Sequence, residues 1–519
     1  MDKVKILWAD DEIDLLKPHI LFLENKGYEV IKAKSGDEAI DLVTQNHFDV
    51  VFLDENMPGV SGLDALIAIR KERKSLPVVM ITKSEEEHIM EEAIGGEISD
   101  YLIKPVNPHQ ILLSLKKILD NSRLVSEKST SDYQKEFREI GMRLSDHLEA
   151  EDWVDIQKKL VYWDLKLSKS SDSGMDEILG MQKTEANGAF SKFVGKNYLD
   201  WLNSPDEYTP VMSHTLLEKK LLPKLKSGKP TFLLLMDCLR YDQWRVLQPI
   251  FSQHFLIEED TCYMSILPTA TQYARNSIFA GLMPSEIQKR FPSKWVNDND
   301  EGSKNDFEED FIKDLLQRNG MGNLKVSYNK ITNLYKGKKL LEDFHQLISN
   351  DLNVIVYNFV DTLSHARTDI KVMRELAEDE KGYRSITKSW FENSPLLEML
   401  KKLNGTKAEV ILTTDHGTVH VDNAVKVKGD KDISNNLRYK AGKSMQYKSK
   451  DVFEINDPKE AYLPMPNVST KYIFARKDDF FAYPNNFNHY VKYYKNTFQH
   501  GGISMEEMVI PVITMTSKP

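Results

Sequence analysis

Short apolar runs alternate with amphipathic segments over the first 120 residues. The segments between the runs, such as 37–46 and 63–73, have helical periodicity. The apolar runs predict β-strands over residues 4–10, 28–33, 49–54, 77–82 and 99–103. Strands and helices in alternation are typical of a parallel sheet covered by helices on both faces. We therefore predict a doubly wound α/β domain over residues 1–120.

The strand pattern disappears between residues 121 and 215. Residues 126–141 are polar and charged, and predict a solvated helix that continues from the first domain. Residues 168–177 are rich in serine and glycine and predict a loop. We expect a helical domain over residues 121–215 that couples its two neighbours. A stripe of four large apolar residues at helical spacing predicts one buried helix face: Trp153, Ile156, Leu160 and Trp163.

Apolar strands return from residue 216 to residue 519. They are separated by helical segments, which predicts a second α/β domain over residues 216–519. The runs that carry most of the polar chemistry at their ends are 231–237, 353–361, 409–417 and 508–515.

Composition excludes several classes of protein. The chain has 519 residues, 69 Lys plus Arg against 79 Asp plus Glu, and a formal charge of −10, which argues against a chain-wide binder of nucleic acid or anionic membranes. No apolar run is long enough for a membrane span or a signal peptide, and two cysteines cannot form a disulfide framework. No zinc-finger spacing or clear helix-turn-helix is present, so we expect a cytoplasmic protein without direct operator DNA binding.

Polar residues follow each strand of the first domain where the strand ends. Asp10 and Asp11 follow the first strand, Asp54 ends the third, Thr82 ends the fourth, and Lys104 follows the fifth. Ligands bind at the carboxyl ends of parallel strands, and three carboxylates together favour a hard divalent cation such as Mg²⁺. A carboxylate beside this ion can attack a phosphoryl donor.

The acidic pair, the D-E-N-M-P segment, the threonine and the K-P pair resemble the receiver domain of two-component response regulators. The resemblance implies a sensor histidine kinase as partner and a homodimer promoted by phosphorylation. It also implies the following roles: Asp54 as phosphoacceptor, Asp10, Asp11, Asp54 and the carbonyl of Asn56 as Mg²⁺ ligands, Thr82 and Tyr101 as the switch pair, and Lys104 as the group that holds the transferred oxygens.

A second set of polar residues lies at the strand ends of the C-terminal domain. The set is Asp237, Asp361 with His365, the adjacent Asp415 and His416, and His500 before two glycines. Oxygen and nitrogen ligands suit zinc or manganese, and six of them with one hydroxyl suffice for two ions about 4 Å apart.

Two threonines in residues 266–284, Thr269 and Thr271, are candidate nucleophiles. Helical residues follow Thr271, so it could face phosphate from a helix N-terminus. The commoner use of a threonine before a helix is as an N-cap, and this alternative stays open.

The order of these residues, Asp, Thr, D-x-x-x-H, D-H and a late His, resembles the two-zinc site of the alkaline phosphatase superfamily. The P-T-x-T segment resembles its nucleotide phosphodiesterase branch, and H-G-G-I-S-M-E-E-M resembles the ending of PglZ-type members. The resemblance implies in-line attack by Thr271 on a nucleotide-type phosphodiester, and hydrolysis of the phospho-threonine. It implies two Zn²⁺ sites, one formed by Asp361, His365 and His500, and the other by Asp237, Asp415, His416 and Thr271.

Residues 425–451 carry eight Lys/Arg against three Asp/Glu directly after the Asp-His pair. A solvated loop is the usual meaning of such a run, but it could also lie over the site and attract an anionic substrate. Within it, Arg438 and Lys440 are candidate substrate-binding residues, as is Asn276, although a solvent-exposed helix face explains Asn276 equally well.

Three classes of function stay open. The first is a phosphorylation-controlled, zinc-dependent phosphodiesterase, with a phosphomonoesterase as its variant. The second is a protein-interaction hub in which zinc only braces the fold, and the third is a metal-dependent mutase. The three-part chain resembles response regulators of the type IX secretion system, which implies sigma-factor and secretion-motor proteins as partners.

Overall fold

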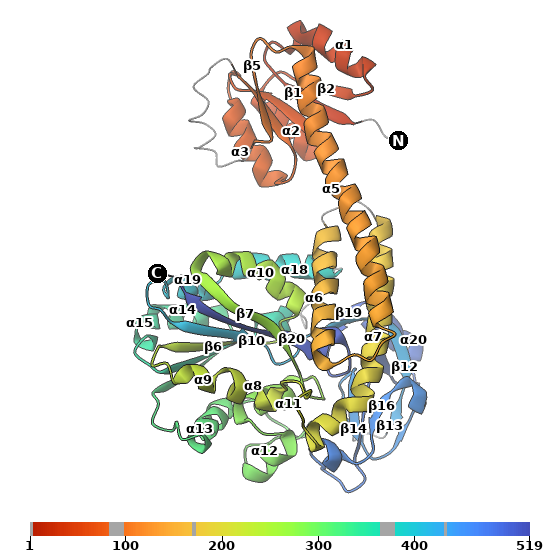
Figure 1. Ribbon diagram of the computed structural model, residues 1–519, viewed down its shortest axis with the longest axis vertical. Helices are drawn as coiled ribbons and strands as arrows, with labels where there is room; N and C mark the ends of the chain where they lie inside the picture. The colour runs from red at the N-terminus through yellow and green to blue at the C-terminus, as the bar shows by residue number, and fades with distance from the viewer. Residues whose placement is uncertain (1–3, 83–97, 169–172, 364–378, 430–432, 519) are drawn as a thin grey trace. The chain divides into compact units, whose positions relative to one another are not determined.

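The computed structural model describes residues 4–82, 98–168, 173–363, 379–429 and 433–518 (Figure 1). The chain forms two compact units, residues 1–132 and residues 133–519. Each unit has hydrophobic core clusters of its own.

The first unit contains a five-stranded parallel sheet with the order β2-β1-β3-β4-β5. The central strands are buried along their length because helices cover both faces, which confirms the predicted doubly wound fold. All five predicted strands are present. The elements are β1 (Lys5–Ala9), α1 (Lys17–Asn25), β2 (Glu29–Ala33), α2 (Gly36–Gln45), β3 (Val50–Asp54), α3 (Gly62–Glu72), β4 (Val78–Thr82) and β5 (Asp100–Ile103).

One helix, α5 (Pro108–Arg143), is 36 residues long and includes the polar segment 126–141. The prediction that a helix continues through this segment is confirmed. Its last turns pack by Tyr133 and Ile140 into the core of the second unit.

Two further long helices, α6 (Ala150–Leu167) and α7 (Ser173–Asn203), pack against each other and share the core of the second unit. The predicted apolar stripe on α6 is buried, with exposed fractions of 5% or less. The loop expected over 168–177 is wrong from Ser173 onward, because those residues already form the first turn of α7. Residues 169–172 lie outside the described part of the chain.

The second unit has a six-stranded mixed sheet with the order β7-β20-β10-β6-β9-β8. The strands β10, β6, β9 and β8 are parallel, while β20 runs antiparallel to β10 and to β7. This confirms the second α/β domain. The strands are β6 (Thr231–Met236), β7 (Phe255–Met264), β8 (Val326–Ile331), β9 (Leu352–Tyr357), β10 (Glu409–Thr413) and β20 (Val509–Ser517). The helices are α8 (Ser213–Lys220), α9 (Leu222–Leu225), α10 (Tyr241–His254), α11 (Thr271–Ala280), α12 (Pro284–Arg290), α13 (Glu308–Arg318), α14 (Leu334–Glu342), α15 (Phe344–Leu347), α18 (Glu380–Glu392), α19 (Pro395–Lys401) and α21 (Met505–Met508).

Between β10 and β20 the chain forms several two- and three-stranded sheets, which we call the small-sheet region (residues 419–499). The basic segment 425–451 lies here, and much of it forms short strands, so the solvated loop expected there is wrong. The elements are β11 (Val419–Val421), β12 (Asn423–Lys426), β13 (Lys428–Gly429), β14 (Tyr439–Gly442), β15 (Met445–Gln446), β16 (Phe453–Ile455), β17 (Lys471–Phe474), β18 (Asp479–Ala482), α20 (Phe487–Tyr494) and β19 (Thr497–Gln499).

Among the described residues, no helix combines the length and the apolar character that crossing a lipid bilayer requires.

Candidate functional site

The first unit brings three carboxylates together at the carboxyl end of its sheet. Oxygen atoms of Asp10, Asp11 and Asp54 lie within 4.8 Å of one another. The Lys104 ammonium lies 3.0 Å from Asp10 Oδ2 and 2.9 Å from Asp54 Oδ2. The peptide bond between Lys104 and Pro105 is cis. Three clustered carboxylates with a single lysine leave negative charge that a divalent cation can neutralise.

Asp54 is buried, with 1% of its surface exposed, and its Oδ1 atom accepts no hydrogen bond from the described residues. Burial raises the pKa of Asp54; Lys104 opposes this rise, and the neighbouring carboxylate of Asp10 adds to it. The first residue of α3, Gly62, packs directly on the end of β3, where a Cβ atom would lie 2.2 Å from the Asp54 carbonyl oxygen. The backbone thus holds Asp54 at the floor of a tight acidic pocket.

The other residues predicted for the receiver site differ in how far they are exposed to solvent. Thr82, at the end of β4, is 2% exposed, whereas the Tyr101 side chain on β5 is 38% exposed. Asn56 lies two residues after Asp54 and is exposed. The two side chains lie on adjacent strands and differ in exposure, and their role as a switch pair stays a prediction.

The second unit brings its own carboxylates together where β6 and β10 end. These strands pair in parallel, so Asp237, just after β6, and Asp415, after β10, emerge at one edge of the sheet. Ligand atoms of Asp237, Asp415 and His416 lie within 4.8 Å of one another, and all three residues are buried.

Two buried oxygen atoms in this cluster, Asp237 Oδ1 and Asp415 Oδ2, have no hydrogen-bond partner among the described residues. Burial raises the pKa of Asp237 well above its ordinary value; Arg275 opposes this rise, while Asp415 and Asp361 increase it. Uncompensated buried carboxylate oxygens cost several kcal/mol unless a cation neutralises them. Together with an adjacent imidazole, this donor set fits a zinc-type ion.

Two histidines, His416 of this cluster and His500 stacked on it, each have one ring nitrogen next to a backbone carbonyl. His416 Nδ1 lies 3.1 Å from the Gly417 carbonyl, and His500 Nδ1 lies 3.1 Å from the Thr269 carbonyl. The two rings stack with centroids 4.2 Å apart. A carbonyl partner at Nδ1 places the proton there and leaves the Nε2 lone pair for a metal, the usual arrangement for histidine ligands.

The two candidate threonines have different surroundings. Thr271 Oγ1 lies 3.1 Å from His416 Nε2, and Thr271 is the first residue of α11, with Ala270 as the N-cap. The side chain of Thr269 is buried, donates to the Gly502 carbonyl and accepts from the Gly501 N–H. Only Thr271 therefore presents its hydroxyl to the carboxylate and histidine cluster, and it does not cap the helix.

Asp361 follows β9 and lies close enough to Asp237 and Cys238 to raise the pKa of both groups. Cys238 is buried and adopts a left-handed backbone conformation with φ of 68°. Its N–H donates to Asp415 Oδ1 over 3.3 Å. His365, predicted as a ligand with Asp361, lies outside the described residues.

Sequence reasoning missed the role of Arg275. Its guanidinium is 2% exposed and donates to Asp237 Oδ2 over 2.7 Å and to Glu308 Oε1 over 2.7 Å. Tyr328 and Lys330 also contact the carboxylate of Glu308. Arg275 thus orients a candidate metal ligand. The sequence offered one signal for this role: Arg275 comes four residues after Thr271, and residues at that spacing share one face of a helix.

The predicted substrate contact of Asn276 does not fit its surroundings. Asn276 Nδ2 donates to the carbonyls of Gln272 and Lys304, and its Oδ1 accepts from Asn305. The residue is 2% exposed, so the exposed helix face is also wrong. Asn276 instead holds residues 304–305 against α11.

Arg438 is equally unsuited to the predicted role of attracting substrate. The side chain is fully buried and forms two hydrogen bonds with Glu507, at 3.1 and 2.6 Å. It also donates to the carbonyls of Lys477 and Asp479. Gly502, in the loop after His500, donates its N–H to Glu507 over 2.9 Å. Arg438 therefore braces the loop that carries His500.

We expect Arg438→Met to lower the free energy of unfolding by about 3–5 kcal/mol, because it leaves the Glu507 carboxylate buried without its partner. Urea unfolding followed by circular dichroism measures this loss. The exposed Lys443 of the same segment provides a matched control, and Lys443→Met should change the unfolding free energy by less than about 0.5 kcal/mol. Equal stability of the two variants would contradict the bracing role.

Three segments of the chain match known family models. Residues 216–515, more than half of the chain, match the family described as the BREX system PglZ alkaline phosphatase-like domain. The chain belongs to the PglZ family. Residues 6–116 match the response regulator receiver domain, and residues 123–202 match the PorX response regulator linker domain. The chain thus joins a receiver domain to a PglZ effector domain. The boundaries 1–120, 121–215 and 216–519 stay predictions.

Curated relatives and solved structures match the receiver domain. The transcriptional regulatory protein ResD of Bacillus subtilis is 33% identical over 118 residues, which are 23% of this chain and 49% of ResD. SrrA of Staphylococcus aureus is 26% identical over 26% of this chain and 56% of SrrA. The chain therefore spans about half the length of these relatives. The chemotaxis protein CheY4 of Vibrio cholerae is 32% identical over 22% of this chain and 99% of CheY4, with a TM-score of 0.21.

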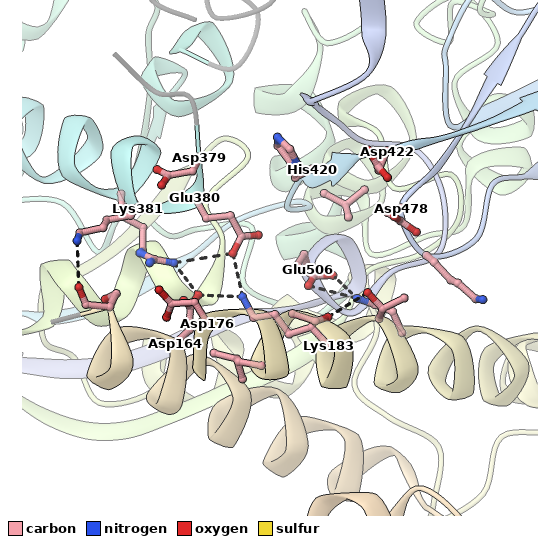
Figure 2. A pocket seen from close by; sticks show the side chains of 18 residues that line it. Asp164, Asp176, Lys183, Asp379, Glu380, Lys381, His420, Asp422, Asp478 and Glu506 are labelled. Carbon is pink, nitrogen blue, oxygen red and sulfur yellow. Dashed lines mark hydrogen bonds and ion pairs between the residues drawn. The ribbon is translucent and has the colours of Figure 1, made fainter. Parts of the chain in front are cut away.

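A polar cavity of 450 Å³ lies between the linker helices and the PglZ domain (Figure 2). Lys183 of α7 bridges Asp164 of α6 and Glu380 of α18, at 2.9 Å each. Arg384 of α18 contacts the same Asp164 and also Asp242 of α10. The ion pairs in this cavity thus connect α6 and α7 to helices of the PglZ domain.

Helix α7 also forms hydrogen bonds with the segment that follows His500 and with the segment that precedes Thr271. Asn187 accepts from the Met505 N–H over 2.7 Å and donates to Glu506, close to the loop that follows His500. The Tyr198 hydroxyl accepts from the Leu267 N–H over 2.8 Å, shortly before Thr271. A shift of α7 would therefore displace both loops, the one after His500 and the one before Thr271.

Proposed function

We propose that this protein is a two-component response regulator in which phosphorylation of Asp54 controls a zinc-dependent phosphodiesterase. Its substrates are nucleotide or oligonucleotide phosphodiesters. The position of the Thr271 hydroxyl, 3.1 Å from His416 Nε2 and beside buried carboxylates with unpartnered oxygens, carries this proposal. A hydroxyl in such a place has the surroundings of a nucleophile rather than of a structural group.

The PglZ domain would hold two zinc ions, and the receiver domain would hold Mg²⁺ by Asp10, Asp11, Asp54 and Asn56. When bound, zinc supplies the positive charge that lowers the pKa of a coordinated hydroxyl and neutralises charge on phosphate. One zinc would be held by Asp361, His365 and His500, and the other by Asp237, Asp415, His416 and Thr271.

The residues of this chain then perform the displacement. The Thr271 oxygen forms a bond to phosphorus, the bond from phosphorus to the leaving oxygen breaks in line with it, and water later hydrolyses the phospho-threonine. The N-terminus of α11 directs its free N–H groups toward the phosphoryl oxygens. Arg275 holds Asp237 in position throughout.

Phosphorylation would reach this site through the linker helices. The contacts of α7 with the loops beside His500 and Thr271 support this route, as does the ion-pair network at Lys183. The match of residues 123–202 to the PorX linker supports a cytoplasmic role in regulating type IX secretion. The expected partners are a sensor histidine kinase, a sigma factor and a secretion-motor protein.

Removal of zinc should abolish turnover of bis(p-nitrophenyl) phosphate, and added zinc should restore it, because the buried carboxylates repel the phosphate anion unless metal ions neutralise them. Mass spectrometry should find two zinc ions per chain. Asp415→Asn should lower this content, whereas Asp422→Asn, which changes an exposed carboxylate, should not. Full turnover in chelator with no metal bound would contradict the proposal.

Zinc removal should also change how stability depends on pH. Burial raises the pKa of Asp237, so the folded metal-free protein holds this proton more tightly than the unfolded chain does. The stabilisation is complete at low pH and is lost as pH rises through the raised pKa. The Tm of the zinc-free protein should therefore fall as pH rises above the ordinary titration range of a carboxyl group, and the gain in Tm on adding zinc should grow.

A further inference from the structure

A second cavity, with a volume of 590 Å³, lies in the small-sheet region and takes no part in the metal centre. A volume of this order is within the range of small-molecule sites. Helix α20 and strand β18 form one part of its wall, and residues before and within β14 form another. The lining residues are Gly429, Ile433, Asn435, Leu437, Lys440, Phe481, Ala482, Tyr483, Tyr490 and Tyr494.

Aromatic rings dominate one side of this cavity. Three tyrosines line it, and Tyr483 is 37% exposed. The planes of Tyr490 and Tyr494, one turn apart on α20, are within 12° of parallel. Tyr490 and Tyr494 are half-buried: they pack against a hydrophobic cluster that includes Phe480 and Ala482, and they also line the cavity. Partly exposed, parallel rings are surfaces on which a planar aromatic ligand stacks.

Among the described residues that line the cavity, Lys440 has the only cationic side chain. Its ammonium donates one hydrogen bond, to the Ser434 carbonyl over 2.8 Å, and its other donors have no partner among the described residues. Burial lowers the pKa of Lys440 to about 8, so the ammonium is still charged at neutral pH. A half-buried cation with unused donors favours an anionic oxygen such as that of a phosphate.

The segment that contains Lys440 also packs against the loop that follows His500. On the loop after His500, a Cβ at Gly501 would lie 2.7 Å from Tyr439 Cδ1, and one at Gly502 would lie 3.0 Å from Arg438 Cζ. Residues 436–439 therefore pack directly on this loop, while Leu437 and Lys440 line the cavity. The segment 436–440 therefore contacts both the cavity and the loop after His500.

We propose that this cavity binds a nucleotide unit of an oligonucleotide substrate next to the scissile diester, with its base on the tyrosine rings and its phosphate on Lys440. The proposal rests on the proposed phosphodiesterase function and names its substrate class more closely. It assigns substrate selection to the small-sheet region and catalysis to the strand ends.

The test compares two substrates with the zinc-loaded full chain. One is 5′-phosphorylated diadenylate, and the other is methyl p-nitrophenyl phosphate, a diester without a base or a second phosphate. Lys440→Met and Tyr483→Ala should each raise KM for the dinucleotide by about five- to a hundredfold, the range for loss of one base-stacking or charged contact. Both variants should leave kcat/KM for the small diester within about twofold. Lys443→Met removes an exposed lysine outside the cavity and should change neither value.

Unchanged KM for the dinucleotide in both variants, with the small diester still hydrolysed, would overturn the nucleotide site and leave the phosphodiesterase intact. Equal losses for both substrates would also overturn it, because they would show a general defect. If the wild type hydrolyses neither diester, the proposed function fails. A direct binding measurement with a nucleotide then tests the cavity on its own.

Equilibrium dialysis with adenosine 5′-monophosphate and ribose 5-phosphate provides that measurement. The two probes share a phosphate, so a difference in affinity reports contact with the base. The wild type should bind the adenosine monophosphate at least about fivefold more tightly, and Tyr483→Ala should remove this difference. Equal affinities in the wild type would overturn the proposal, and the surface would then be a candidate for a protein partner.

Discussion

Thr271→Ala should lower turnover of a phosphodiester by about a thousandfold or more, because it removes the oxygen that forms the bond to phosphorus. The loss should appear in kcat. The fold should survive, since the Thr271 hydroxyl makes its contact with His416 and does not cap α11. Steady-state hydrolysis of bis(p-nitrophenyl) phosphate by the zinc-loaded protein measures the effect.

Two variants make this result specific. Thr271→Ser keeps a hydroxyl at the same position and should retain measurable turnover. Thr269→Ser keeps the hydroxyl that contacts Gly501 and Gly502, and should be close to wild type. Turnover in Thr271→Ala near the wild-type rate would exclude Thr271 as the nucleophile, and the interaction-hub alternative would then gain support.

The sequence predicted the sheets and the strand-end residues because both follow local rules. An apolar run specifies a buried strand, and the next polar residue must emerge at the end of that strand. Parallel pairing then brings Asp237 and Asp415 together although 178 positions separate them. The residues alone left Thr269 and Thr271 open, and the family resemblance favoured Thr271; the structure distinguishes the two hydroxyls by their partners.

Buried charged residues were the part that sequence could not place. Arg275 and Arg438 look like surface cations in the sequence, but their partners lie 33 and 69 positions away, at Glu308 and Glu507. Nothing in the basic run 425–451 distinguishes the residue that will be buried from its exposed neighbours. Such pairs become visible only when the tertiary fold brings both charges to one place.

Asp54→Asn should abolish every response of the protein to beryllofluoride or acetyl phosphate with Mg²⁺. In the unphosphorylated protein, Lys104 lies 2.9 Å from Asp54 Oδ2, and Asp10 and Asp11 are beside it. A phosphoryl group on Asp54 adds charge to a buried position, and Lys104 and Thr82 must rearrange to contact its oxygens. We expect that rearrangement to change the exposed surface at Tyr101 and to create the surface on which a second copy docks.

Light scattering of the full chain should therefore show the mass double on addition of beryllofluoride, with no change for Asp54→Asn. Asp41→Asn, which alters an exposed carboxylate on α2, should behave as the wild type. Lys104→Met keeps the acceptor but removes its cationic contact, so it should weaken the response. A wild-type mass that stays monomeric while diester turnover changes would contradict dimerisation and favour transmission through α5 and α7 within one chain, because those helices connect the receiver domain to the loops beside Thr271 and His500.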